Sequence, residues 1–163
     1  MQKSFTTQPE LFVTSADLEH TSLQGLDGAE AVLDWQKLEQ IMAGIYASKT
    51  GRPSYPLLTL LRASLLGIWY RLSDVDLAQA LFRDLLFRKF CHLELGGDVP
   101  DATTIGRFRT RLVEHDLWEV LLGDVNRQLE AKHIIMTEGR INIIDATPVE
   151  AARSGPGKGA DGQ

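Results

Sequence analysis

Hydrophobic side chains recur every three or four residues along most of this chain, the spacing that places them on one face of an α-helix. The first such stripe consists of Trp35, Leu38, Met42 and Ile45. Pro56 suits the first turn of a second helix, and apolar residues occupy nearly all faces of the segment 57–70 that follows. An all-round apolar helix belongs in the interior, so this pattern predicts a central, buried helix.

Three further helices follow from the same spacing. Ser73 is a good N-cap for the third, with Asp76 three residues later as an imperfect capping box. We expect its apolar positions to face the core, namely Leu77, Leu81 and Leu85, with Phe82, Leu86 and Phe90 widening that edge. After a loop at 96–100, a fourth helix runs to about His115, capped by Asp101, Thr103 or Thr104. The fifth carries an apolar stripe of Trp118, Leu121, Leu122, Val125 and Leu129.

The pattern then changes character. The run 141–150 is rich in β-branched residues and predicts a strand whose apolar side chains point to both faces, as in a sheet interior. A lone strand leaves its edges unpaired, which favours instability or self-association. The segment 153–163 is rich in glycine and predicts a flexible tail, whereas residues 1–28 are polar and weakly patterned, with ordered helix expected after them.

Composition narrows the functional classes. The chain has 163 residues and a formal net charge of −5, which excludes a uniformly basic protein. Between Arg52 and Arg111, however, nine Lys or Arg stand against six Asp or Glu, so the middle of the chain permits a nucleic-acid-binding face. The single cysteine, Cys91, excludes a disulfide framework or a multi-cysteine zinc site, and we expect it to be a small buried apolar residue.

No segment of the sequence suggests a membrane. The most apolar stretch, 57–70, is interrupted by Arg62 and is too short to span a bilayer. The first residues lack the long apolar region of a secretory signal. We therefore expect a cytoplasmic protein without a membrane partner.

Asp145 directly follows the apolar pair Ile143 and Ile144, where an ionised carboxylate is costly to desolvate. A divalent cation would offset that cost, and metal-dependent phosphoryl transfer uses carboxylates in such positions. The alternative is an ordinary turn in which Asp145 bonds its own backbone near Thr147, before Pro148. The residues around it leave both interpretations open.

The predicted fourth helix is a second candidate site. Its apolar stripe is formed by Ile105, Phe108 and Leu112, and its opposite side carries Thr103, Arg107, Thr110 and Arg111. Hydroxyl and guanidinium groups in this arrangement suit phosphates or guanine edges, and a preceding helix and loop would complete a helix-turn-helix-like element. The alternative is a solvated face in which Glu114 pairs with Arg107 or Arg111. The loop at 96–100 is longer than the tight turn such elements prefer.

Four segments together point to a family. They are Gly51–Pro56, Trp69–Asp74, Val99–Ile105 with Phe108 and Arg109, and Ile144–Ala151. In this order and spacing they resemble the N-terminal part of bacterial insertion-sequence transposases of the insertion sequence five type, over roughly residues 28–152. The resemblance implies a helical DNA-binding region followed by a ribonuclease-H-like catalytic domain, in which two Asp and one Glu bind divalent metal.

By this resemblance, Asp145 is the first catalytic carboxylate and a ligand of Mg²⁺. Only residues 146–163 follow it, so the second Asp and the Glu are not in this sequence, and we expect no catalysis and no tight Mg²⁺ binding from this chain alone. The fold class expected is therefore mainly α: about five helices with a helix-turn-helix-like element, then one or two strands of an incomplete ribonuclease-H-like domain. The corresponding regions are residues 1–28, 29–133, 134–152 and 153–163.

The leading hypothesis is thus an N-terminal transposase fragment that binds double-stranded DNA at the terminal inverted repeats of a transposon. Its expected DNA-binding residues are Thr103, Thr104, Arg107, Arg109, Thr110 and Arg111. The alternatives are a non-catalytic regulator or DNA-binding repressor that pairs with full-length transposase, and a non-functional remnant. The protein partners considered are full-length transposase and a second copy of this chain in a homo-oligomer.

Overall fold

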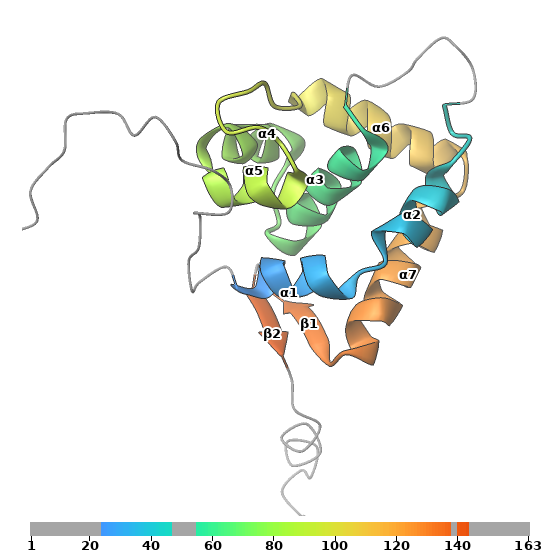
Figure 1. The fold of residues 1–163 in the computed structure, drawn as a ribbon. Helices are drawn as coiled ribbons and strands as arrows, with labels where there is room; N and C mark the ends of the chain where they lie inside the picture. Colours follow the sequence, from blue (N-terminus) through green and yellow to red (C-terminus); the bar gives the residue numbers. More distant parts are fainter. Residues whose placement is uncertain (1–23, 47–54, 138–139, 144–163) are drawn as a thin grey trace, which may run out of the picture.

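A computed structural model describes residues 24–46, 55–137 and 140–143 of the chain, and all structural statements below concern these residues. They form seven helices and two strands (Figure 1). The helices are α1 Gln24–Val32, α2 Trp35–Met42, α3 Leu57–Trp69, α4 Asp74–Arg83, α5 Leu85–Cys91, α6 Ala102–Glu114 and α7 Trp118–Ala131. The strands are β1 Ile134–Thr137 and β2 Arg140–Ile143. The predicted mainly α fold is therefore confirmed.

Helix α3 lies at the centre of the bundle, as its all-round apolar sequence predicts. It packs against α2, α4, α5 and α6, and Figure 1 shows these helices around it on several sides. Every residue from Thr59 to Leu66 is buried, including Arg62. Gly67 lets α3 and α4 approach closely, because a Cβ atom there would lie 3.2 Å from Leu77 Cδ2. No described helix has the length and apolar content that a bilayer span requires.

Four helices end at a non-glycine residue in the left-handed backbone region. These residues are Arg71, His92, Asp116 and His133, with φ between 52° and 58°. After three of them the next amide donates back to a carbonyl in the last helical turn, as in a Schellman motif: Leu72 to Gly67, Leu93 to Arg88 and Leu117 to Leu112. Glycine usually occupies this position, so its absence removed the signal by which sequence alone marks a helix end.

Helix α1 was not predicted. It begins at Gln24 and crosses residue 28, where ordered structure was expected to start, so that boundary is wrong. Gly25 and Gly28 lower the helix propensity of this segment and hide its pattern. The fold overrides propensity here because Leu26, Ala29 and Leu33 are all buried in the core.

The predicted third helix is in fact two helices, α4 and α5, divided at Asp84. This residue has an extended backbone (φ −99°, ψ 108°) and caps α5 by accepting hydrogen bonds from the amides of Leu86 and Phe87. The break changes the helical phase. Leu77 and Leu81 are buried as predicted, but Phe82 is 68% exposed and Leu85 is 45% exposed, so the prediction that these two face the core is wrong.

Residues 141–143 of the predicted strand 141–150 lie in β2, which is not alone, and residues 144–150 lie outside the described residues. Strand β2 pairs antiparallel with β1, in a register that places Ile134 opposite Ile143 and Thr137 opposite Arg140. Strand β1 packs against α7 and β2 against α1 (Figure 1). The expectation of an entirely unpaired strand is therefore wrong, because residues 134–137 supply one partner.

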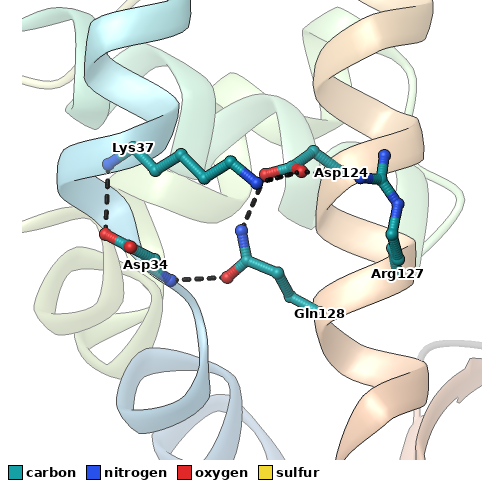
Figure 2. A network of polar contacts seen from close by, with 5 residues as sticks. All are labelled: Asp34, Lys37, Asp124, Arg127 and Gln128. Carbon is teal, nitrogen blue, oxygen red and sulfur yellow. Dashed lines mark hydrogen bonds and ion pairs between the residues drawn. The ribbon is translucent and has the colours of Figure 1, made fainter.

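A polar network joins the start of α2 to α7 (Figure 2). Asp34 caps α2, and its own amide donates to Gln128 Oε1 at 2.6 Å. Buried Asp124 accepts from Lys37 Nζ at 2.8 Å and from Gln128 Nε2 at 2.7 Å, and Arg127 lies 3.4 Å away. Burial alone would raise the pKa of Asp124, but these hydrogen bonds and the charges of Lys37 and Arg127 hold that pKa below its ordinary value.

Candidate nucleic-acid interface

The candidate interface is the outward face of α6, which crosses one side of the bundle and packs on α3, α4 and α7 (Figure 1). The predicted helix is confirmed, and of its three predicted caps Asp101 is the one that acts. Its side chain accepts a hydrogen bond of 2.7 Å from the amide of Thr104. The predicted inner stripe of Ile105, Phe108 and Leu112 is fully buried, which fixes the rotation of the helix.

With the inner stripe fixed, the face opposite carries Thr103, Arg107 and Thr110, followed by Glu114 at the end of the helix, all of them exposed. These residues follow the three-to-four spacing of one helical line. Arg107 forms no ion pair with any other residue in the described ranges. Its guanidinium is therefore available to an external acceptor.

The other predicted contact residues are placed differently. Arg111 lies one turn beyond Arg107 but is only half exposed, with its guanidinium carbon 5.2 Å from the ring centroid of Tyr46. Thr104 is half-buried at the start of the helix, where its amide is already bonded to Asp101. The six residues thus do not form one uniform surface.

Arg109 lies away from the exposed line and has a partner inside the protein. Its Nη2 forms an ion pair with Asp74 Oδ2 in the first turn of α4. The side chains are 40% and 29% exposed, so the pair is only partly shielded from water. This contact orients α6 relative to α4.

The local charges favour an accessible Arg107. The amide and side-chain hydrogen bonds from Thr104, together with the charge of Arg107, lower the pKa of Asp101 and keep this exposed carboxyl ionised. Glu114 was the alternative partner for Arg107 or Arg111, but it forms an ion pair with neither within the part of the chain described. The alternative in which Glu114 occupies these arginines therefore has no support in the contacts of α6.

Asp145 lies outside the described residues. Among residues 24–46, 55–137 and 140–143, no three His, Cys, Asp or Glu side chains are close enough together to share a metal ion. Cys91 is fully buried, as expected, and burial raises the pKa of its thiol well above the ordinary range.

The sequence did not reveal Arg88, a buried residue that connects the end of α4 to the loop leading into α6. It lies on α5 next to Lys89, and its side chain is buried, with 4% exposure. Its guanidinium donates to the carbonyls of Leu81 and Phe82 at the end of α4, and to those of Glu94 and Gly97 in the loop that leads to α6. The sequence gives no signal for these hydrogen bonds, because their acceptors are backbone carbonyls, which every residue has.

A comparison with known protein families places the chain in one of them. A family profile described as "Transposase domain (DUF772)" matches residues 18–111, more than half of the chain. The matched range includes α1 to α5 and most of α6, and it ends before Asp145. No solved structure matches the chain.

Proposed function

Because the chain belongs to the DUF772 transposase domain family, we propose that it binds double-stranded DNA at the terminal inverted repeats of a transposon. The outward face of α6 makes the contacts in this proposal. Membership of the family indicates a transposase-related function on DNA, and the position of the binding face is the finer step that we add.

The observation that carries this step is the exposed line of Thr103, Arg107 and Thr110 on a helix whose other side is buried. A guanidinium without an internal partner suits a phosphate or a guanine edge, and threonine hydroxyls suit phosphates. Arg111 adds a second guanidinium one turn later, restrained by Tyr46. Thr104 and Arg109 act indirectly in this proposal, by holding α6 in place. Thr104 lies at the capped start of the helix, and Arg109 connects the helix to α4 through Asp74.

The surrounding helices support a helix-turn-helix-like use of α6. In such elements one helix is held against the recognition helix, which enters the major groove. Here α4 packs on α6 and is tied to it by the pair between Asp74 and Arg109. The connection from α5 to α6 spans residues 92–101, longer than a tight turn, and Arg88 fixes its course through the carbonyls of Glu94 and Gly97.

A salt titration tests the proposal. Affinity of the full chain is measured for a duplex carrying the terminal inverted repeat and for a scrambled duplex of equal length. Counterion release should make log affinity fall with log salt. Arg107→Ala should weaken binding, by about 1–3 kcal/mol if the side chain reads a base, and should make the salt slope shallower.

Arg127→Ala is the matched control. Arg127 is another exposed arginine, on α7, with a side chain that is 72% exposed. Its removal deletes the same charge without touching α6, so duplex affinity should stay close to that of the parent chain. If neither duplex binds at low salt, or if the two alanine variants lose affinity equally, the proposed face is wrong.

We also propose that Asp145 is the first metal-binding carboxylate of a catalytic site, a role supported by its sequence context alone. The family resemblance implies two further carboxylates, and we assign neither of them to a residue of this sequence. The role predicts that Asp145→Asn leaves duplex affinity in the absence of metal within about twofold of the parent value. It also predicts that the same change abolishes Mg²⁺-dependent strand cleavage in a transposase chain that carries all three carboxylates.

A further inference from the structure

The outer face of α4 carries apolar side chains although it is exposed to solvent. Val75 is 58% exposed and Phe82 is 68% exposed, and Ala78 and Gln79 lie between them on the same helical face. Positions i, i+3, i+4 and i+7 are the spacing of a helix face that packs against another element. Within the described residues nothing covers this face.

A groove extends this apolar surface toward α6. It has a volume of about 410 Å³ and is lined by Ala78, Gln79, Phe82, Arg83, Val99, Pro100 and Asp101. Arg88 holds its walls in place, because the same guanidinium binds the end of α4 and the loop before Val99. The surface is therefore preformed, which lowers the cost of binding a partner.

The charges on this face are arranged so that it complements itself. Asp76 lies in the first turn of α4 and Arg83 in the last, and neither forms an ion pair with another described residue. When two copies of α4 run antiparallel about Gln79, Asp76 of each copy faces Arg83 of the other, and Val75 faces Phe82. The two helix dipoles then also oppose each other, which is favourable.

We propose that the outer face of α4 binds a second copy of this chain, in an antiparallel arrangement around a twofold axis near Gln79. A twofold contact is isologous, so one patch must satisfy itself, as this pattern of charges and apolar residues does. A different protein would have to supply separate acidic and basic groups for Arg83 and Asp76. Nucleic acid is disfavoured on this face because its two exposed charges, Asp76 and Arg83, cancel and leave no net positive charge.

Sedimentation velocity of the full chain over a range of concentrations, without DNA, tests this inference. The chain should show a reversible monomer–dimer equilibrium. Phe82→Glu should remove the dimer, because it places a carboxylate in the apolar centre. Val120→Glu is the matched control, since Val120 is a similarly exposed residue (51%) on α7, and it should leave the equilibrium unchanged.

A charge exchange provides the decisive second test and does not depend on Phe82. Arg83→Glu and Asp76→Arg should each raise the dissociation constant of the dimer by about tenfold or more, since like charges then face each other. Mixing the two variants should restore the dimer. Each mixed pair keeps one contact between the original Asp76 and Arg83, and its other contact joins the two introduced side chains, which carry opposite charges. Circular dichroism verifies that each variant is folded.

Three results would overturn the inference: a wild-type chain that stays monomeric, a Phe82→Glu chain that dimerises as well as wild type, or mixed charge variants that do not associate. The readout contains no DNA. Failure of the dimer therefore leaves the proposed DNA contacts of α6 untouched, and loss of DNA binding by Arg107→Ala leaves the dimer untouched.

Discussion

Arg88 and Arg107 are the same amino acid with opposite surroundings. Arg88 is 4% exposed and gives its hydrogen bonds to four backbone carbonyls, two at the end of α4 and two in the following loop. Arg107 is exposed on α6 and pairs with no other described residue. A count of basic residues therefore says little about nucleic-acid binding until the internal partners of each arginine are known.

Arg88 acts as a side-chain cap for α4. The last carbonyls of a helix have no intrahelical partner. Here the amide of Asp84 donates to the carbonyl of Ala80, and the guanidinium of Arg88 donates to those of Leu81 and Phe82. Because the same guanidinium holds the loop at Glu94 and Gly97, one side chain positions both the α4 face and the approach to α6. Its role is thus structural, yet both proposed surfaces depend on it.

The largest expected effect follows from replacing this residue. Arg88→Met keeps the apolar stem but leaves four carbonyls without their donor, and should lower the free energy of unfolding by about 3–5 kcal/mol. Urea unfolding followed by circular dichroism measures the loss. Arg88→Lys keeps the charge but lacks the planar guanidinium, so the stability of this variant should lie between that of the parent chain and that of Arg88→Met. A loss for Arg88→Met within about 0.5 kcal/mol, the range of an ordinary surface change, would contradict the structural role.

Local structure was predictable from the sequence wherever one pattern dominated. The apolar run of α3 and the stripe of Ile105, Phe108 and Leu112 follow from local rules and are present, whereas the same rules left three candidate caps for α6, of which Asp101 is the cap. The division of α4 from α5 was missed because the apolar spacing continues across Asp84, although Asp is a favoured N-cap residue and here caps α5.

The candidate site was predictable only in outline. Periodicity places Arg107, Arg109 and Arg111 on α6 but cannot say which is available. Availability depends on residues far along the chain: Asp74 pairs with Arg109, and Tyr46 lies against Arg111. Arg88 was missed for the same reason, since its acceptors are carbonyls that carry no mark in the sequence.

Arg62 tests whether a buried arginine with an acidic partner behaves like Arg88. Its guanidinium pairs with Glu30 of α1, donates to the carbonyl of Phe90 at 2.9 Å, and stacks 3.7 Å from the ring centroid of Trp35. Arg62→Met should lower the free energy of unfolding by about 2–3 kcal/mol, less than Arg88→Met, because fewer carbonyls lose a donor. Urea unfolding gives the value.

Glu30→Gln is the control for this comparison. Glu30 has a side chain that is 37% exposed, so water can replace part of its interaction, and the expected loss is about 1 kcal/mol or less. If this variant were as unstable as Arg62→Met, the ion pair rather than the stacking and the carbonyl bond would account for the role of Arg62.

Asp124 extends the comparison to a buried acid and adds a pH dependence. Its pKa is lower in the folded protein than in the unfolded chain, so its stabilising effect is present above the unfolded value of about 3.9 and is lost as pH falls through the folded value. Asp124→Asn should cost about 1–2 kcal/mol at neutral pH, because it weakens the contacts with Lys37 and Gln128.

Thermal melting at a series of pH values checks this prediction. The difference in melting temperature between wild type and Asp124→Asn should shrink as the pH falls below about 4, where the Asp124 carboxylate of the unfolded chain is protonated before that of the folded protein. A difference that is constant from neutral pH to pH of about 3 would show that the charge of Asp124 does not contribute, and that only its hydrogen-bonding shape matters.

Arg107→Ala should have the smallest effect on stability, within about 0.5 kcal/mol of the parent chain, because the side chain has no internal partner to lose. Arg88→Met is expected to lower stability, whereas Arg107→Ala should leave stability unchanged. Arg107→Ala should instead lower duplex affinity and make its salt dependence shallower. Unfolding and DNA binding are measured on the same preparation. A stability loss as large as that of Arg62→Met would mean that Arg107 serves the fold, and its lower DNA affinity would then no longer locate the interface on α6.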